Sequence, residues 1–374
     1  MIPADLRILI AGGGTGGHLF PGVAVAEEFL RQVPGGRVLF AGTERGMEAK
    51  VLPGLGYPLR TIPVAGLRGK GPMGILGGLM KIPAALSASR DILREYGPHL
   101  VFGVGGYASG PVVLAARFMN VPTAIAEQNA APGLTNRILG RFALRIFVSF
   151  PETLSFFDGK KAVLAGNPVR RGFVDAPAEK RDRDGRFTVL VYGGSQGAKA
   201  INDAVLTALP LFRDRGEDIV LIHQTGAADY ERVRAAYERA GAAGEVHSFI
   251  DDMAAFYDRA DLLVCRAGAT TVAEITARGK AAVFIPFPFA VGDHQTKNAE
   301  VLVRQGAAEM ILQKDLDGEG IFRAVRRLAG DREGTARMGE RARKLGNIHA
   351  ARDIVAECLR LLDARGDGTE RNTD

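Results

Sequence analysis

Residues 6–22 read LRILIAGGGTGGHLFPG, an apolar run that passes directly into a glycine-rich turn. The run Leu6 to Ala11 has the length and composition of a buried strand, and the segment Gly17 to Val33 has the apolar spacing of a helix. A glycine turn between a strand and a helix lets backbone N–H groups converge on an anion at the positive end of the helix dipole. This stretch therefore predicts a phosphate-type loop in a parallel α/β sheet.

A second turn of the same kind lies in the other half of the chain, where residues 187–198 read FTVLVYGGSQGA. One glycine turn indicates one anion site. Two turns, in opposite halves, predict a two-domain protein that closes over phosphorylated ligands.

Short β-rich runs alternate with helical stretches along both halves, which is typical of parallel strands joined by right-handed crossovers. The sequence thus predicts an α/β protein with two Rossmann-like doubly wound sheets. The expected strands are Leu6 to Ala11, Arg37 to Gly42, His99 to Gly105, Pro122 to Glu127 and Leu144 to Phe150, then Phe187 to Tyr192, Asp218 to Gln224, Glu245 to Phe249, Asp261 to Arg266, Ala281 to Pro286 and Ala307 to Leu312.

A proline-containing turn, Gly166 to Arg171, precedes the charged run Ala176 to Arg186, as expected for a domain boundary. We expect a first domain over 1–166 and a second over 167–349. Residues 350–364 have apolar positions at helical spacing and must bury a face, whereas the polar segment 365–374 is expected to be a disordered tail.

The composition is that of a globular protein with ordinary cores: 374 residues, 47% hydrophobic, with a formal net charge of +6 that favours anionic partners. Nucleic acid is not expected among them, because neither zinc-finger spacing nor an RNA-recognition signature occurs. Cys265 and Cys358 are the only cysteines, so no disulfide framework or metal cluster is expected and a reducing compartment is favoured. We expect neither a membrane-spanning helix nor a cleavable signal.

Gly12, Gly14 and Gly17 satisfy the G-x-G-x-x-G pattern of dinucleotide-binding proteins. That interpretation requires an acidic residue at the end of the second strand, where Glu44 is separated from the strand by Gly42 and Thr43. A nicotinamide-dependent oxidoreductase is therefore an alternative with weak support.

His18 follows the first glycine turn by one position, where its ring would face the crevice at the carboxyl ends of the strands. A local capping or packing role is the alternative to a catalytic one. Further polar candidates also follow expected strands; they are Tyr107, Glu127 to Asn129, Arg266 to Glu274 and Asp293 to Gln295.

Taken in order, these segments resemble the MurG family of N-acetylglucosaminyltransferases over nearly the whole chain. The shared motifs are GGTGGHLFPG at 13–22, GGYASGP at 105–111, EQN at 127–129, GNPVR at 166–170, GGSQGA at 193–198, FIDDM at 249–253 and CRAGATTVAE at 265–274.

The resemblance implies a glycosyltransferase B-type fold, with two domains facing a cleft and the last helix crossing back to the first domain. It implies transfer of GlcNAc from UDP-GlcNAc, bound mainly by the second domain, to the C4 hydroxyl of a lipid-linked muramoyl-pentapeptide acceptor, bound mainly by the first. The transfer inverts the anomeric carbon, requires no cofactor or metal, and serves peptidoglycan synthesis. A non-catalytic nucleotide-sugar binding protein is the alternative from another class.

Carried over residue by residue, the resemblance assigns Ile250 to uracil, Glu274 to the ribose, Gln295 to the sugar, and Gly14 and Tyr107 to the acceptor. His18 is expected to be the general base, with Glu127 as the second candidate. The remaining donor-site residues are Thr15, Gly16, Gly17, Asn129, Arg170, Ser195, Ala269, Thr270, Thr271, Val272 and Ala273. Many relatives have a His at the position of Ala126, and some have a Gln at the position of His294.

The acceptor's lipid tail implies a peripheral protein at the cytoplasmic face of the cell membrane, with other cell-wall enzymes as possible partners. Ile75, Leu79 and Ile82 form an apolar stripe with Lys81 and further bases nearby, which predicts an interfacial patch that attracts anionic lipids. A buried core face is the alternative explanation of this stripe.

Overall fold

The computed structural model describes residues 5–64, 80–175, 185–215 and 218–370, and for 365–370 it describes the backbone alone. The chain divides into two compact units. Unit 1 comprises 1–170 and 348–374, and unit 2 comprises 171–347. The expected boundary after residue 166 thus lies four positions before the division in the structure.

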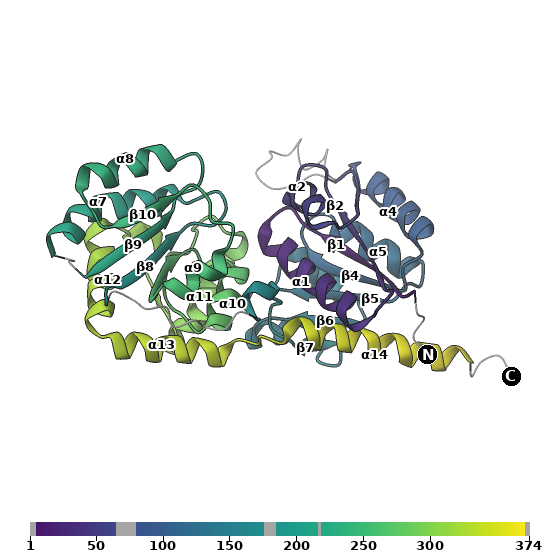
Figure 1. Cartoon of the computed structure of the whole chain (residues 1–374). Helices are drawn as coiled ribbons and strands as arrows, with labels where there is room; N and C mark the ends of the chain where they lie inside the picture. Colours follow the sequence, from purple (N-terminus) through teal and green to yellow (C-terminus); the bar gives the residue numbers. More distant parts are fainter. Residues whose placement is uncertain (1–4, 65–79, 176–184, 216–217, 371–374) are drawn as a thin grey trace. The chain divides into compact units, whose positions relative to one another are not determined.

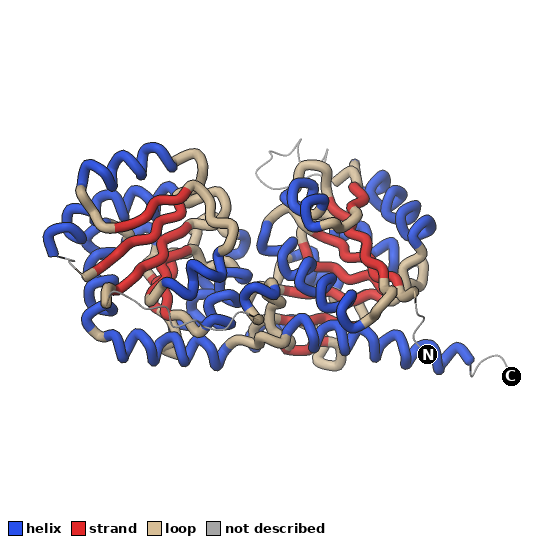
Figure 2. The backbone as a smooth tube through the Cα atoms, in the orientation of Figure 1, coloured by secondary structure: helices blue, strands red, loops and turns tan. Residues whose placement is uncertain are grey.

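Unit 1 is built on a seven-stranded sheet of order β3-β2-β1-β4-β5-β6-β7, and all neighbouring strands are parallel (Figures 1 and 2). Chain order reverses between the adjacent strands β1 and β4, which makes this the topological switch point. The strands are β1 (Arg7–Gly12), β2 (Arg37–Gly42), β3 (Leu59–Thr61), β4 (Leu100–Gly105), β5 (Thr123–Glu127), β6 (Arg145–Val148) and β7 (Ala162–Leu164).

Helices cover both faces of this sheet because the side chains of each strand alternate between them. Ile8 and Ile10 of β1 belong to the core beneath α1 (Gly16–Gln32) and α14 (Ala350–Glu370). Leu9 and Ala11 belong to the core on the opposite face. That face is covered by α4 (Ile82–Tyr96), α5 (Ser109–Phe118) and α6 (Leu134–Leu139). The short helix α2 (Met47–Val51) follows β2.

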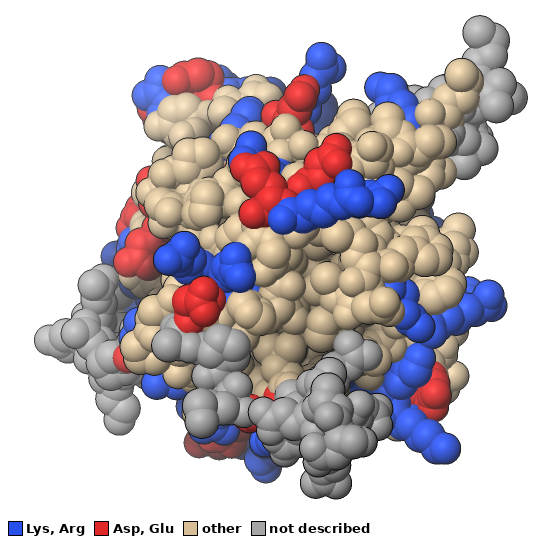
Figure 3. Space-filling model, turned by 90° about the vertical axis from the view of Figure 1, so that its right-hand side faces the viewer, with Lys and Arg blue, Asp and Glu red and all other residues tan. Residues whose placement is uncertain are grey.

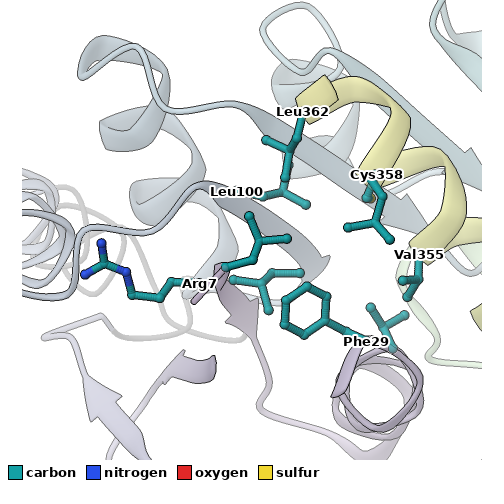
Figure 4. A pocket seen from close by; sticks show the side chains of 10 residues that line it. Arg7, Phe29, Leu100, Val355, Cys358 and Leu362 are labelled. Atoms are coloured by element: carbon teal, nitrogen blue, oxygen red, sulfur yellow. The ribbon is translucent and has the colours of Figure 1, made fainter. Parts of the chain in front are cut away.

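The last helix, α14, returns to unit 1 and lies along α1, as predicted (Figure 1). Ile354, Val355 and Cys358 are buried in the same core as β1, and Arg145 forms an ion pair with Glu357 at 2.9 Å. A small apolar pocket remains between the helix and the sheet; Figure 4 shows Val355, Cys358 and Leu362 facing Phe29 and Leu100 across it.

The expectation of a disordered tail from residue 365 was wrong for residues 365–370, because the helix continues to Glu370. Propagation of an existing helix adds one backbone hydrogen bond for each residue fixed, so α14 extends past Leu362, which packs on the core of unit 1. Residues 371–374 lie outside the described part of the chain.

Unit 2 repeats the architecture with six parallel strands in the order β10-β9-β8-β11-β12-β13. Its switch point lies between β8 and β11. The strands are β8 (Phe187–Tyr192), β9 (Ile219–Gln224), β10 (Gly244–His247), β11 (Leu262–Cys265), β12 (Ala281–Phe284) and β13 (Glu309–Met310).

The helices of unit 2 bury apolar faces against both sides of this sheet. One core lies beneath α7, α8 and α12 and includes Val189, Val191 and Phe322. The helices are α7 (Lys199–Arg215), α8 (Tyr230–Ala240), α9 (Met253–Arg259), α10 (Ala269–Arg278), α11 (His294–Arg304), α12 (Gly318–Gly330) and α13 (Arg332–Leu345).

Candidate functional site

The glycine turns after β1 and β4 meet at the switch point of unit 1. A β-carbon at Gly12 would overlap the carbonyl oxygen of Gly105, and one at Gly106 would overlap that of Gly13. These glycines are required because two backbones approach each other here. Gly14 differs, since a β-carbon there would meet no atom within 4 Å and its φ is +90°. Of these glycines, it is the one with open space where a β-carbon would lie.

The first turn already holds an anion from its own chain, the carboxylate of Glu48. Oε2 accepts a hydrogen bond from the Gly14 N–H at 2.6 Å, and Oε1 accepts from the backbone N–H and the hydroxyl of Thr43, both at 2.8 Å. Glu48 is 0% exposed. The Gly14 N–H of the predicted phosphate loop is thus already bound by the Glu48 carboxylate.

His18 lies in the first turn of α1, half-buried, with Nδ1 3.2 Å from the Thr15 hydroxyl oxygen. Its Nε2 lies 3.1 Å from where a β-carbon of Gly105 would be. The ring therefore lies against the turn after β4, at the switch point. Thr15 precedes the helix as its N-cap residue, and Gly16 and Gly17 form its first two positions.

Glu127, the second candidate base, is buried in a set of internal hydrogen bonds. Oε1 accepts from the backbone and side-chain nitrogens of Asn129 at 3.0 and 3.2 Å, and Oε2 accepts from the Gly133 N–H at 3.0 Å and Asn136 Nδ2 at 2.9 Å. At 2% exposure the carboxylate shapes the loop after β5. This geometry does not support Glu127 as a base, because four donors already use its oxygens. Asn129 is held in place by it.

Tyr107 and Gln128 complete the carboxyl edge around the switch point. Tyr107 is 49% exposed and follows the second glycine turn of unit 1. Gln128 is buried, and its Nε2 donates to the Val104 carbonyl at 3.1 Å. Its Oε1 has no hydrogen-bond partner among the described residues and lies 3.8 Å from the β-carbon position of Gly105.

In unit 2 the turn Gly193–Gly197 follows β8 and places exposed Ser195 at the carboxyl edge. Gly194 has a φ of +97° and, like Gly14, open space where a β-carbon would lie. Beside it, across the switch point, α10 begins at Ala269 with no acidic residue in its first turn. Ala269 to Ala273 thus present the positive end of a helix dipole at the edge where Ser195 lies.

A buried glutamine joins this turn to Ile250. Gln224, at the end of β9 and 1% exposed, donates from Nε2 to the Gly194 carbonyl at 3.0 Å and accepts from the Ile250 N–H at 2.9 Å. The residue expected to contact uracil is therefore positioned by the same side chain that holds the glycine turn.

Behind the turn lies a buried polar network centred on His223. Its Nε2 contacts Asn202 Oδ1 at 3.0 Å and its Nδ1 contacts the Tyr237 hydroxyl at 3.2 Å. Burial lowers the pKa of His223 to about 3, against the smaller opposing effect of the Asp229 carboxylate. The imidazole is therefore neutral at physiological pH. Asn202 Nδ2 donates to the Thr225 carbonyl and to Asp229 Oδ2, which ties α7 to the loop after β9.

Glu274 lies on the second turn of α10 and is 6% exposed. Its neighbour Cys265 is fully buried, and burial raises the pKa of that thiol to about 12. Cys265 is therefore an unreactive thiol beside the expected ribose position.

Gln295 and Arg266 both hold the segment after β12. Gln295 Oε1 accepts from the Phe287 N–H at 3.0 Å, and Arg266 donates to the carbonyls of Ile285 and Pro286, each at 3.0 Å. Burial lowers the pKa of Arg266 to about 10, so the guanidinium remains charged. His294 Nδ1 donates to the Val291 carbonyl at 2.8 Å.

Arg170 belongs to unit 1, where its guanidinium lies over the Phe20 ring at 4.5 Å. The candidate residues divide between the two units. Unit 1 contains Gly14, Thr15, Gly16, Gly17, His18, Tyr107, Glu127, Asn129 and Arg170, and unit 2 contains Ser195, Ile250, Ala269, Thr270, Thr271, Val272, Ala273, Glu274 and Gln295.

Sequence reasoning missed Glu48 and Gln224. Gln224 was detectable, since it ends an expected strand beside the glycine turn. Glu48 carried no such signal, because only the path of α2 returns it to the first turn. The described residues contain no group of three or more His, Cys, Asp or Glu that could hold a metal ion. Within the same residues, no helix combines the length and hydropathy needed to span a membrane.

Comparison with known proteins gives consistent matches over both units. The model of the glycosyltransferase family 28 N-terminal domain matches residues 8–148, and that of the family 28 C-terminal domain matches 188–357. The UDP-N-acetylglucosamine--N-acetylmuramyl-(pentapeptide) pyrophosphoryl-undecaprenol N-acetylglucosamine transferase of Syntrophus aciditrophicus is 51% identical over 357 residues, with 96% of this chain and 99% of the relative covered. The protein of the same name from Pelobacter propionicus is 50% identical, with 95% and 99% covered.

Among solved structures, Acinetobacter baumannii MurG matches with a TM-score of 0.77 and 33% identity, covering 95% of this chain and 100% of that one. This match confirms the expected B-type glycosyltransferase fold. The fold consists of two parallel-sheet units, each with a glycine turn at its switch point, and the similarity to these relatives spans nearly the full length of the chain. The chain therefore belongs to glycosyltransferase family 28, within the MurG family.

Proposed function

We propose that this protein transfers GlcNAc from UDP-GlcNAc to the C4 hydroxyl of the MurNAc-(pentapeptide)-diphospho-undecaprenol acceptor, the step that completes the lipid-linked disaccharide of peptidoglycan. The main support for this proposal is a sequence identity of 50–51% to relatives named for this reaction, over nearly the whole of both chains. The glycine turns, the candidate base and the buried acid on α10 lie at the carboxyl edges where such a reaction needs them.

The donor belongs to the switch point of unit 2 in this proposal. The Ile250 backbone recognises uracil, and Glu274 accepts hydrogen bonds from the ribose diol, for which a carboxylate with two acceptor oxygens is suited. Ser195 and the first turn of α10 bind the diphosphate, because a helix N-terminus without acidic residues favours an anion. Gln295, fixed through Oε1, directs its Nε2 as a donor to a sugar hydroxyl.

The acceptor belongs to the switch point of unit 1, where Gly14 and Tyr107 border it. The acceptor O4 forms a bond to C1 of GlcNAc while the bond from C1 to the diphosphate oxygen breaks, and the configuration at C1 inverts. The O4 proton passes to the imidazole of His18, and UDP leaves with the bonding electrons. His18 suits this role because its ring faces the switch point and its Nδ1 is engaged by Thr15.

Charge that develops on the leaving diphosphate is the main electrostatic demand of this step. In unit 2, Ser195 and the N–H groups of α10 take this role. The candidate donor-binding residues of unit 1 are Arg170, Thr15, Gly16, Gly17 and Asn129. Buried Glu127 and half-buried Asn129 act by holding the loop after β5 rather than by moving a proton.

A membrane-contact surface at the start of α4 fits a lipid-linked acceptor and a position at the cytoplasmic membrane face. Met80 is 75% exposed, Ile82 is 40% exposed, and exposed Lys81 lies between them. Because α4 follows β3 and precedes β4, it begins at the carboxyl edge of the sheet, the edge that carries the acceptor site. The predicted residues Ile75 and Leu79 lie outside the described part.

Charge alone does not define this surface. On the face seen in Figure 3, basic and acidic side chains are interspersed around a broad uncharged area. The proposed contact therefore combines apolar insertion with a modest attraction of about 1 kcal/mol per nearby Lys or Arg to anionic lipid.

The experiment that tests the function measures UDP release from UDP-GlcNAc with and without a lipid-linked muramoyl acceptor, with UDP-GalNAc as the control donor. We expect release that depends on both the acceptor and the GlcNAc configuration. UDP-GlcNAc binding without acceptor-dependent release would indicate a binding protein instead. A melting temperature raised by NAD(P) and not by UDP would indicate an oxidoreductase, which is disfavoured because Glu48 occupies the turn that would bind the pyrophosphate.

A further inference from the structure

The first glycine turn has the sequence of a phosphate loop but is filled by a side chain of its own unit. The Glu48 carboxylate accepts hydrogen bonds from Gly14 and from both donors of Thr43, so it joins the turn after β1 to the end of β2. The partners described for it are neutral donors.

Three glycines from three segments leave the space for this carboxylate. A β-carbon at Gly13, Gly42 or Gly46 would overlap the carboxyl group or the side chain of Glu48. These glycines lie in the turn after β1, at the end of β2 and at the N-cap of α2. The cavity is therefore shaped around a planar, doubly accepting anion.

A second anion at Gly14 would compete with this carboxylate. The Gly14 N–H is already used at 2.6 Å, and an incoming phosphate would face a buried carboxylate that forms no ion pair with the residues the structure describes. Burying like charges side by side is strongly unfavourable. This switch point differs from that of unit 2, where α10 begins without an acidic residue in its first turn.

Glu48 is also connected to His18 through consecutive residues. It fixes Gly14, Gly14 precedes Thr15, and the Thr15 hydroxyl contacts His18 Nδ1 at 3.2 Å. A shift of the turn would move the ring away from Gly105, against which its Cδ2–Nε2 edge lies.

We propose that Glu48 is a positioning residue of the acceptor site. Its carboxylate is the built-in anion of the first glycine turn, so the turn receives an uncharged part of the acceptor rather than a phosphate. Through the turn, Glu48 also holds His18 in the position required for the transfer. This inference rests on the proposed function. It assigns the turn to a hydroxyl-bearing sugar portion of the acceptor and places the acceptor diphosphate elsewhere.

The test uses the full chain with Glu48→Gln, Glu48→Ala and, as a matched control, Glu44→Gln, which changes an exposed glutamate on the same connection. We expect Glu48→Gln to lower kcat roughly ten- to hundredfold, since its amide group faces donors, while the Kd for UDP stays within about twofold of wild type. Glu44→Gln should match wild type. Wild-type kinetics in Glu48→Gln, or an equal loss of UDP affinity, would overturn the proposal.

Chemical rescue separates an anion requirement from a general packing defect. Glu48→Ala leaves a cavity bordered by the Gly14 and Thr43 donors, so formate should restore part of kcat and raise the melting temperature, while formamide should do neither. Inorganic phosphate should stabilise Glu48→Ala but not wild type. Equal stabilisation of both proteins by phosphate, or equal rescue by formamide, contradicts the proposal.

Two further readouts keep the test decisive. If Glu48→Ala does not fold, Thr43→Val takes its place, because it removes one donor to the same carboxylate. It should lower kcat by a smaller factor and leave UDP binding unchanged. An unchanged kcat in this variant would contradict the proposal. If wild type itself shows no acceptor-dependent UDP release, the proposed function has failed, and the phosphate and formate shifts still report whether the turn requires an anion.

Discussion

The backbone N–H of Ile250 donates a hydrogen bond to Oε1 of Gln224 at 2.9 Å, in the interior of unit 2. The other end of the same amide holds the Gly194 carbonyl at 3.0 Å. One side chain therefore positions both the segment assigned to the base and the turn assigned to the diphosphate. A donor that binds both segments depends on this amide even though Gln224 itself is buried.

Gln224→Leu should raise the KM for UDP-GlcNAc roughly ten- to hundredfold with a smaller effect on kcat. The reason is that an unpaired N–H at Ile250 and an unpaired carbonyl at Gly194 each cost about 1–3 kcal/mol when buried. Initial rates at saturating acceptor provide the measurement. Gln305→Leu, at an exposed position in the same unit, is the control. Equal KM values in the two variants would contradict a positioning role.

Substitutions at His18 and Glu127 should have different effects. His18→Ala should lower kcat by about two orders of magnitude or more, with donor binding nearly unchanged, because it removes the proposed base. Glu127→Gln should instead lower the melting temperature, since four donors lose a carboxylate. Single-turnover rates and thermal unfolding distinguish the two variants. A Glu127→Gln variant that is as stable as wild type but has lost the chemical step would indicate that Glu127 is the base.

Stability should fall as the pH decreases below about 6.5, the pKa of an unperturbed histidine, because of His223. Its pKa is lowered to about 3 in the folded protein, so between pH 6.5 and 3 the unfolded chain binds one more proton than the native state. The free energy of unfolding should lose up to about 1.4 kcal/mol per pH unit in this range from His223 alone, and nothing above it. Urea unfolding at pH 7.5 and pH 5 measures the effect. His223→Gln should show a smaller slope; parallel slopes would contradict this assignment.

Ile354→Ala should destabilise the protein by about 2–5 kcal/mol, because Ile354 is fully buried where α14 packs on unit 1. Chemical denaturation of the whole chain is the measurement. Leu345→Ala removes a side chain that is 42% exposed at the end of α13 and should cost much less. A comparable loss in both variants would show that α14 contributes little to the core.

Changing Met80 and Ile82 together to Ser should weaken binding to vesicles that contain anionic lipid, since two exposed apolar side chains leave the proposed contact. The melting temperature should change little, and activity on a short-chain soluble acceptor should persist. Co-sedimentation with vesicles measures binding, and Leu345→Ser serves as the control. A large loss of stability would show instead that these side chains belong to the core.

The strands of both sheets could be predicted because parallel strands buried on two faces appear as continuous apolar runs. Leu6 to Ala11 and Phe187 to Tyr192, for example, agree with β1 and β8 within one residue. The edge strands β3 and β7 were missed. Each has three residues, half-buried or exposed, and a run that short carries no periodicity.

The site was predictable as far as it depends on local pattern. The glycine turns, His18 and Ser195 were located from the strand-turn-helix order, and the structure places them at the carboxyl edges. Glu48 and the role of Glu127 were not predictable, because both depend on where a distant segment directs its donors. Glu44, the acid nearest the end of β2, is exposed, whereas Glu48 enters the turn.

The return of α14 to unit 1 has a practical consequence for dissecting the enzyme. Unit 2, residues 171–347, is one uninterrupted stretch of polypeptide, so a single segment of the gene encodes it. Unit 1 is assembled from two separate pieces, and truncation after residue 347 would uncover the apolar groove that Ile354 and Val355 fill. Chimeras of this family should therefore be joined at two points rather than one.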